Sequence, residues 1–308
     1  MAAVHGEDIP LRLLLIHAHP DDESLATGVT MAHHVERGDE VHVLTCTLGQ
    51  EGEVIPTELK HLELPVGQPR DPDAPDPLGE VRRAELAAAM TAMGVASHRV
   101  LGEDGGPWWR DSGMVGTPSA AHPRAFAGAD VEAVGAQVRS LIDELAPDAV
   151  VTYDLHGGYG HPDHIQTHRV TLAAIRGMAV ERRPQVFGVV TPTSWYEQDL
   201  AWLRRELTPQ RCAEWGVHLP PEDDTHQLSV VPDEAVSHAT VAPDAVPRQR
   251  AAIAEHRTQV RLIPGAFVLS NDLPTRTAGR EAYQLLDPDS GRPQPVTGPI
   301  TDLWGARE

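Results

Sequence analysis

The stretch LRLLLIHAHPDDES, from Leu11 to Ser24, decides the fold. It begins with a short apolar run, Leu11 to Ile16, passes through a polar turn, and continues into a helical pattern from Ser24 to Arg37 that stops at Gly38. A short apolar run bounded by polar residues predicts a buried strand, and a glycine directly after a helical pattern is typical of a helix C-terminus. The stretch therefore predicts a strand, a polar turn and a helix in succession.

The same alternation continues through the first two thirds of the chain. Further strands are expected over Glu40 to Thr47, His98 to Leu101, Ala149 to Tyr153 and Val186 to Thr191, and further helices over Glu80 to Met93, Val131 to Leu145 and His164 to Val180. Strands separated by helices of this length favour right-handed crossovers and a parallel sheet. The sequence thus predicts an α/β fold, with a doubly wound, Rossmann-like, mostly parallel sheet in the order 3-2-1-4-5 and helices on both faces.

The last third of the chain is less regular. Two short strand-like runs are expected at 228–231 and 236–241, a helix from Arg248 to Val260, and surface coil from Pro288 to Pro299. We therefore expect residues 1–195 to form the core that carries the functional site. Residues 196–308 would then be an elaborated C-terminal extension, packed on that core within the same domain.

The composition argues against several kinds of partner and location. With 25 basic and 45 acidic residues, the formal net charge of −20 would repel nucleic acid and anionic membrane surfaces. The apolar run at 11–16 is too short for the core of a signal peptide or for a membrane span. Two cysteines, Cys46 and Cys212, are too few for a disulfide framework or an all-thiolate metal site. We expect a small-molecule substrate and a cytoplasmic location.

Two connections are too long to be simple turns. Residues Leu48 to Leu78 are rich in Pro, Asp and Glu, and residues Gly102 to Ala129 contain GGPWWRDSG. Loops longer than about 12–15 residues in a compact domain are usually functional or disordered. We expect both connections to form walls over a site.

Polar clusters rich in histidine and aspartate follow two of the predicted strands. The first is HAHPDDE, His17 to Glu23, and the second is YDLHGGYGHPDH, Tyr153 to His164. In doubly wound sheets ligands bind beyond the carboxyl ends of the strands, and strands one and four are neighbours in the expected order. The two clusters should therefore face each other across one crevice.

Imidazoles and carboxylates that converge without thiolates indicate a hydrolytic metal site. Catalytic zinc typically has three protein ligands of these types and keeps a fourth position for water. His19, Asp22 and His164 supply such a set. The sequence therefore predicts that these three side chains bind a metal ion.

Three neighbouring side chains are candidates for the chemistry itself. Asp21 is the carboxylate left beside the ligand set, and it can act as the general base. His161 lies one helical turn before the last ligand, and Tyr159 lies in a glycine-rich loop. Both could approach a developing oxyanion and stabilise it.

Several of these residues also have simpler explanations. The run from Asp21 to Ser24 could cap the first helix, which is the ordinary role of acidic residues at a helix start. Capping does not account for His19 or for the second cluster, so we prefer the metal site. His17 is expected to be a strand-end histidine. For His256 both core packing and a role in the site are open, and core packing is favoured. Supporting or surface positions are expected for Glu23, His156, Asp163 and His168.

At these residues the sequence resembles the LmbE-like, or PIG-L, family of zinc de-N-acetylases. The family signatures AHPDDE and HPDH stand at residues 18–23 and 161–164. The stretches TCTLGQEGEVI at 45–55, WRDSGMVGT at 109–117 and VVTYD with GGYGHPDH at 150–164 resemble the members that act on N-acetylglucosaminyl-inositol in mycothiol biosynthesis. The likeness runs from about Leu13 to Thr191, with a weaker match at HRTQV, residues 256–260.

The resemblance implies hydrolysis of the N-acetyl group of a small amino sugar with one Zn²⁺ per chain. Fe²⁺ or Co²⁺ are potential substitutes in a site of this type. The resemblance assigns the metal ligands, the general base and the two stabilising residues to the same positions as the prediction made above from the residues alone. It also implies that Arg82 and Asp111 bind the substrate.

Two other functions compete with this one. A related amidase that cleaves mycothiol S-conjugates would use the same zinc core, but the loop with Trp108, Trp109, Arg110 and Asp111 suits a sugar better than a long apolar group. A nucleotide-binding Rossmann module would need a glycine-rich first turn, and the HPDDE carboxylates would repel a pyrophosphate. The oligomeric state is left open.

Overall fold

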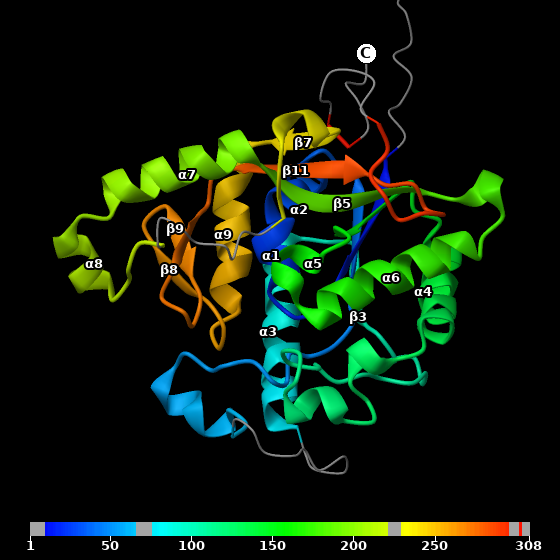
Figure 1. Ribbon diagram of the computed structural model, residues 1–308, viewed down its shortest axis with the longest axis horizontal. Helices are drawn as coiled ribbons and strands as arrows, with labels where there is room; N and C mark the ends of the chain where they lie inside the picture. The colour runs from blue at the N-terminus through cyan, green and yellow to red at the C-terminus, as the bar shows by residue number, and fades with distance from the viewer. Residues whose placement is uncertain (1–9, 66–75, 221–228, 296–301, 304–308) are drawn as a thin grey trace, which may run out of the picture.

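The centre of the molecule is a mixed sheet of eight strands in the order β3-β2-β1-β4-β5-β11-β7, with β6 paired to β5 (Figure 1). The computed structural model describes residues 10–65, 76–220, 229–295 and 302–303. The strands are β1 (Arg12–His17), β2 (Glu40–Thr45), β3 (Ser97–Val100), β4 (Ala149–Tyr153), β5 (Gln185–Pro192), β6 (Val230–Val231), β7 (His238–Val241) and β11 (Arg280–Leu285). Strands β1 to β5 are parallel to one another, so the predicted doubly wound fold and strand order are confirmed.

Strand β1 lies in the middle of the parallel part. Leu13 pairs with Val41 of β2 on one side and with Ala149 of β4 on the other. Successive side chains of a strand point to opposite faces of a sheet. Accordingly, Leu13 belongs to the apolar cluster on one face and Leu14 to the cluster on the other, and both are fully buried. This two-sided burial explains the continuous apolar run in the sequence.

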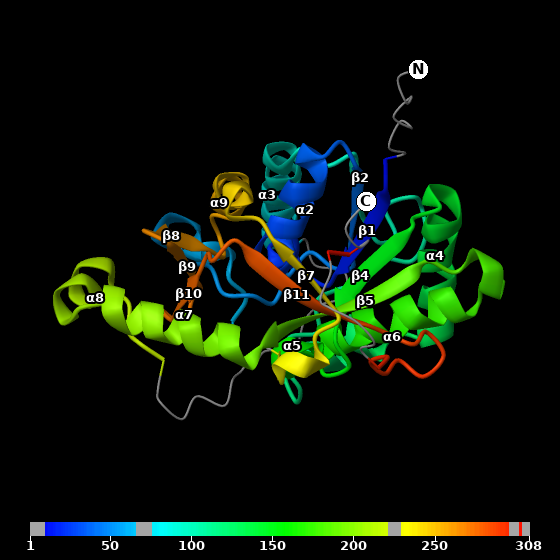
Figure 2. The same ribbon diagram turned by 90° about the horizontal axis from the view of Figure 1, so that it is seen from above.

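Helices cover both faces of the sheet. Figure 2 shows α2, α3 and α9 on one side and α6 on the other. The helices are α1 (Asp22–Ala26), α2 (Gly28–Glu36), α3 (Pro77–Met93), α4 (Val131–Leu145), α5 (Gly157–Gly160), α6 (Pro162–Arg176), α7 (Thr193–Glu206), α8 (Pro209–Trp215) and α9 (Val246–Glu255). The short 3₁₀ helices are η1 (Thr57–Leu62), η2 (Pro118–Ala121), η3 (Phe126–Gly128), η4 (Val180–Arg182), η5 (Asp233–Ala235) and η6 (Pro243–Ala245). The layers place every βα turn of the parallel strands at one edge of the sheet.

The C-terminal third adds to this sheet and also builds outside it. Strand β11 pairs antiparallel with β5, and β7 pairs antiparallel with β11. A separate sheet contains β8 (Arg261–Ile263), β9 (Ala266–Val268) and β10 (Pro274–Arg276). Helices α7 and α8 extend away from the main sheet (Figures 1 and 2). In the described part of the chain, no helix combines the length and apolar character needed to cross a membrane.

The structure differs from the sequence prediction at several helices. The helix expected from Ser24 to Arg37 is two helices, because Thr27 leaves the helical conformation and its hydroxyl bonds to the Glu23 carbonyl. The helix expected from Arg248 to Val260 is α9, which starts earlier and ends at Glu255. Helix α7 was not expected; Leu203 is its one buried residue among those described. The expected runs at 228–231 and 288–299 lie partly outside the described residues.

The core on the α4 and α6 side should be sensitive to lost volume. Leu14→Ala is expected to lower the free energy of unfolding by about 2–5 kcal/mol, because it removes buried methyl groups and leaves a cavity. Urea denaturation monitored by circular dichroism measures this change. Val180 is 73% exposed, so Val180→Ala is the control and should stay within about 0.5 kcal/mol of wild type. Equal stability of the two variants would contradict the assignment of Leu14 to the core.

Candidate active site

The two polar clusters meet at the carboxyl edge of the sheet. Strand β1 ends at His17 and β4 ends at Tyr153, and these strands are hydrogen-bonded neighbours. The first cluster continues into α1, and the second runs through α5 into the first turn of α6. The crevice predicted from the strand order is therefore present, with one cluster on each side.

Three nitrogen and oxygen atoms form a nearly equilateral triangle in this crevice. Nδ1 of His19 lies 3.3 Å from Oδ2 of Asp22 and 3.3 Å from Nε2 of His164. The remaining edge, from Nε2 of His164 to Oδ2 of Asp22, is 3.4 Å. Zinc bonds of about 2.0–2.2 Å in a tetrahedral site place neighbouring ligand atoms about 3.3–3.6 Å apart. The three atoms have the spacing of one face of such a tetrahedron.

The second nitrogen of each imidazole also has a partner. Nδ1 of His164 donates to the Gly157 carbonyl at 3.2 Å, and Nε2 of His19 lies 3.4 Å from Oδ2 of Asp163. A histidine that binds a metal through one ring nitrogen commonly donates the other ring N–H to a carbonyl or a carboxylate. This hydrogen bond fixes the orientation of the ring and its tautomer. Gly157 has φ of +64°, and a Cβ there would approach the backbone of Ile165 to 2.7 Å. Only glycine fits at this turn.

Other groups around His19 could also hold an ion. His19, His161 and His164 form one such group, and His19, Asp111 and Asp163 form another. Both share His19 with the triangle and lie in the same crevice. The described residues thus contain a histidine and aspartate cluster able to bind a metal ion, at the place that the sequence predicted.

Tyr153 supports this cluster and was not singled out from the sequence. Its hydroxyl donates to Oδ2 of Asp22 at 2.6 Å and accepts from the Ala18 amide at 2.8 Å. Its ring stacks on the His164 ring, with centroids 4.1 Å apart. Tyr153 therefore ties the two sides of the crevice together. Its position as the last residue of a predicted strand was the available signal.

Asp21 lies between Pro20 and Asp22 with an unusual backbone conformation. Its φ of +120° falls in a region that residues other than glycine rarely adopt. Its amide donates to Oε2 of Glu23 at 3.0 Å. Burial, and then the neighbouring Asp22 carboxylate, raise the pKa of Asp21 to about 8. Asp21 is thus a carboxyl group in surroundings that favour its protonation.

His161 and Tyr159 lie against the same cluster. The His161 ring centroid is 4.7 Å from that of His19 and 5.0 Å from that of His164. The Tyr159 ring lies 5.3 Å from His164, and its side chain is partly exposed. Burial, together with the two neighbouring imidazoles, lowers the pKa of His161 to about 3. Because Nδ1 of His161 accepts from the Asp163 amide at 3.2 Å, the proton of the neutral ring is on Nε2.

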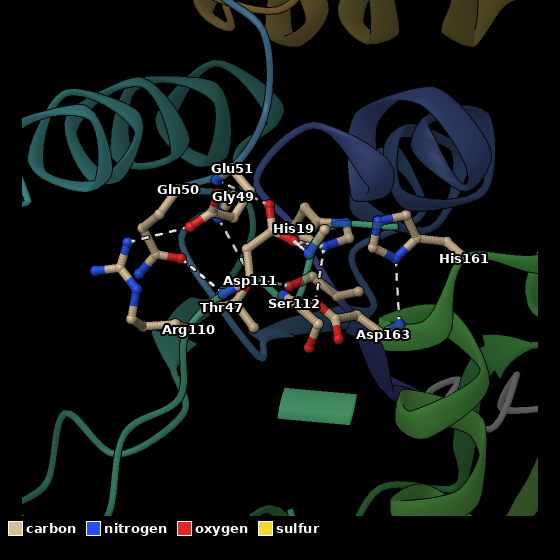
Figure 3. A network of polar contacts seen from close by, with 12 residues as sticks. His19, Thr47, Gly49, Gln50, Glu51, Arg110, Asp111, Ser112, His161 and Asp163 are labelled. Carbon is tan, nitrogen blue, oxygen red and sulfur yellow. Dashed lines mark hydrogen bonds and ion pairs between the residues drawn. The ribbon is translucent and has the colours of Figure 1, made fainter. Parts of the chain in front are cut away.

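Asp111 reaches the cluster from the loop 102–129, as Figure 3 shows. Its Oδ1 lies 3.5 Å from Nε2 of His19 and accepts from the Gly113 amide at 2.8 Å. Its Oδ2 accepts from the Glu51 amide at 3.2 Å. Burial opposes its charge, but His19, then His161 and the Gly113 amide, outweigh burial and lower the pKa of Asp111. The loops 48–78 and 102–129 therefore meet at Asp111, next to the metal-binding cluster.

The two arginines of the sequence analysis point into the loop walls. Arg82 is 2% exposed and donates to the carbonyls of Gly49 and Glu53. Arg110 is buried as well and lies 3.5 Å from a Glu51 carboxylate oxygen (Figure 3). It also lies 3.2 Å from a carboxylate oxygen of Asp76. The sequence analysis expected Arg110 to face a ligand, but its side chain instead joins the two loops. The role of Arg82 in substrate binding stays a prediction.

The remaining histidines and acids of the two clusters have supporting contacts. Asp163 is fully buried and accepts from the Ser112 amide at 2.8 Å, so it also anchors the loop 102–129. His168 donates to the Tyr153 carbonyl at 2.9 Å, and His17 lies 3.0 Å from the Thr27 hydroxyl. These hydrogen bonds fix the backbone and side chains that surround the crevice.

The site combines a cluster able to bind a metal ion with the neighbouring Asp21 carboxyl group, at the carboxyl edge of a doubly wound sheet. This arrangement is suited to metal-assisted hydrolysis. Comparison with known families agrees with this class. The chain belongs to the GlcNAc-PI de-N-acetylase (PIG-L) family, whose model matches residues 14–175.

Relatives that match nearly the whole chain share about two fifths of its residues. A protein of Thermomonospora curvata named 1D-myo-inositol 2-acetamido-2-deoxy-alpha-D-glucopyranoside deacetylase is 42% identical over 297 residues, which are 92% of this chain and 93% of that relative. A relative of the same name from Actinosynnema mirum is 40% identical over 301 residues, 96% and 97% of the two chains. Among solved structures, a deacetylase of the teicoplanin biosynthesis pathway is 21% identical, with a TM-score of 0.48 over 80% of this chain and 84% of that one.

Proposed function

We propose that this protein hydrolyses the N-acetyl group of 1-O-(2-acetamido-2-deoxy-alpha-D-glucopyranosyl)-1D-myo-inositol, giving glucosaminyl-inositol and acetate in mycothiol biosynthesis. The observation that carries the proposal is the ligand triangle of His19, Asp22 and His164, with edges of 3.3–3.4 Å, beside Asp111. The activity named for relatives that are 40–42% identical over at least 92% of this chain supports the substrate.

Zn²⁺ fits the spacing of the triangle and would be held by His19, Asp22 and His164. We favour this set over the other groups around His19 because its three edges are nearly equal and both rings are fixed through their second nitrogens. A zinc ion bound there would polarise the acetamide carbonyl and lower the pKa of a water molecule. Fe²⁺ or Co²⁺ could replace it, since histidine and carboxylate ligands suit these ions too.

The proton and charge transfers are assigned to residues around the triangle. Asp21 accepts a proton from the attacking water, because it is the carboxylate next to the ligand set. His161 has its Nε2–H free to donate toward the acetamide oxygen, since its Nδ1 accepts from the Asp163 amide. The hydroxyl of the partly exposed Tyr159 can donate a second hydrogen bond. The amine then leaves with a proton returned by Asp21 or supplied by His161.

Substrate binding is assigned to the loop walls. Asp111 would accept hydrogen bonds from sugar hydroxyls while its own amide contacts hold it at the crevice. Arg82 would contribute by holding the loop residues Gly49 and Glu53, and direct contact with the sugar requires its guanidinium to turn toward the crevice.

We further propose that residues 1–195 form the catalytic core and that residues 196–308 form an extension packed on it within the same domain. We also propose that the enzyme acts in the cytoplasm on a small molecule.

The proposed function is tested by metal analysis combined with release of free amine from a panel of substrates. The purified protein, loaded with one zinc per chain, should hydrolyse N-acetylglucosaminyl-inositol with a higher kcat/KM than a mycothiol S-conjugate. A better rate on the conjugate would overturn the deacetylase assignment and leave the zinc amidase as the function. Failure to release amine from any N-acetyl sugar would remove the proposed reaction altogether.

The substrate preference should depend on Asp111. Asp111→Ala is expected to lower kcat/KM for N-acetylglucosaminyl-inositol by about 10- to 100-fold, since charged hydrogen bonds to hydroxyls are lost, and to affect the S-conjugate less. Steady-state kinetics on both substrates at equal zinc loading measure the ratio. Asp104→Ala is the control, because Asp104 lies in the same loop with an 84% exposed side chain. An unchanged ratio in Asp111→Ala would show that this loop does not set the preference.

A further inference from the structure

The segment HRTQV, residues 256–260, lies directly behind the first catalytic loop. It follows α9, which packs against α1 and α3 and lies beside α1 in Figure 1. His256 is fully buried, and its Nε2 lies 2.8 Å from Oε1 of Glu23. Glu23 is also fully buried and accepts from the Ser24 hydroxyl at 2.7 Å. A residue more than 230 positions away in the chain thus contacts the motif that carries the proposed base.

This segment fixes the peptide bond between Pro20 and Asp21, one polar group directly and the other through Glu23. The carbonyl oxygen of Pro20 accepts from Nε2 of Gln259 at 2.5 Å. The amide of Asp21 donates to Oε2 of Glu23, whose other oxygen is held by His256. Gln259 therefore fixes one end of the peptide group directly, and His256 fixes the other end through Glu23. Rotation of this peptide plane would break both hydrogen bonds.

The orientation of that peptide plane determines the conformation of Asp21. The φ angle of +120° at Asp21 is measured from this peptide bond, and a residue with a side chain rarely adopts it. Unusual backbone conformations persist only when surrounding contacts impose them. Two such contacts are present: Gln259 donates to the Pro20 carbonyl, and Glu23 accepts from the Asp21 amide. They set the direction in which the Asp21 side chain leaves the backbone.

We propose that His256 and Gln259 are positioning residues. They fix the Pro20–Asp21 peptide and thereby orient the Asp21 carboxylate toward the water molecule from which it takes a proton. The proposal rests on the proposed function in one respect, the role of Asp21 as base. It gives the C-terminal extension a part in turnover that does not involve the metal ligands or the substrate. His256 contacts Glu23 and Ser24, and Gln259 contacts the Pro20 carbonyl, so both would act through this loop.

The variant that tests this proposal is Gln259→Met. Methionine fills a similar volume but cannot donate to the Pro20 carbonyl, and it leaves no buried charge without a partner. Misplacement of a catalytic group by about 1 Å can cost about a hundredfold in rate, so kcat should fall by about 10- to 100-fold. KM for N-acetylglucosaminyl-inositol and bound zinc should each stay within about twofold of wild type, because the substrate walls and ligands are untouched.

A matched control separates positioning from loss of packing. Gln249 is also buried and donates to a backbone carbonyl of α1, that of Ser24, at 3.2 Å, but it does not touch the Pro20–Asp21 peptide. Gln249→Met should therefore keep kcat within about twofold of wild type. Equal losses of kcat in the Gln249 and Gln259 variants would overturn the proposal in favour of a general packing effect.

A double-mutant cycle tests whether Gln259 acts through Asp21. In an Asp21→Asn background, Gln259→Met should lower kcat by less than about twofold, since the group that it aims is already disabled. The same loss in both backgrounds would overturn the proposal, as would zinc lost in parallel with activity. A wild-type protein that releases no amine would instead remove the proposed function.

The structure of the variant gives a readout that does not depend on activity. A crystal structure of Gln259→Met should show the Pro20–Asp21 peptide rotated or the Asp21 side chain displaced. His256→Gln, which can still donate to Glu23, should keep more activity than His256→Leu, which cannot. An unmoved peptide in the Gln259 variant would overturn the proposal, and equal activity of the two His256 variants would remove His256 from it.

Discussion

His164→Ala is expected to lose its bound zinc and its hydrolytic activity together while the fold is retained. Residues that only support metal ligands typically change metal affinity by about 10- to 100-fold, and removal of one of three ligands should cost more. His164 lies in the first turn of α6 at the carboxyl edge of the sheet, outside the two apolar clusters that flank the sheet. Metal analysis after gel filtration, together with circular dichroism and amine release, measures the three quantities.

The matched control for this ligand is another buried histidine with a carboxylate partner. His34 is fully buried in α2, with Nδ1 2.8 Å from Oδ2 of Asp39, away from the crevice. His34→Ala can lose stability but should keep one zinc per chain when folded. His19→Ala and Asp22→Ala should behave as His164→Ala does. Stoichiometric zinc in any one of these three variants would remove that residue from the ligand set.

The sequence predicted the parallel part of the fold because its signals are local. Strands β1, β2, β4 and β5 each contain a short run rich in apolar residues, and right-handed crossovers leave few ways to order such strands. The prediction that two polar clusters converge followed from that order alone. His19, Asp22 and His164 could therefore be placed together before any distance was known.

The contacts that were not predicted connect residues far apart in the chain. Strand β11 follows no local pattern that would reveal its pairing with β5, and α7 has a single buried residue among those described, Leu203. Arg110 lies next to Asp111 in sequence but pairs with Glu51 and turns away from the crevice. The sequence favours core packing over a site role for His256, and it does not reveal the contact of His256 with Glu23, which spans 233 positions. Side-chain direction at such positions depends on tertiary packing, which no window of sequence contains.

Asp21→Asn is expected to keep zinc and substrate binding while kcat falls by about 10²–10⁴-fold, the range typical of a lost general base. Asparagine keeps the shape of the side chain and tolerates a positive φ as well as aspartate does, so the backbone at +120° should be retained. The substitution therefore removes basicity with little other change. Alanine would add a backbone effect at this position and would be harder to interpret.

The measurement is kcat and KM for N-acetylglucosaminyl-inositol at matched zinc content, with Asp21→Glu as the comparison. Glutamate restores a carboxylate but carries it one methylene further from the backbone, so a partial recovery above Asp21→Asn is expected. Recovery by glutamate but not by asparagine would tie turnover to the carboxylate charge and not to side-chain volume. Near-normal turnover of Asp21→Asn with full zinc would mean that another group accepts the proton.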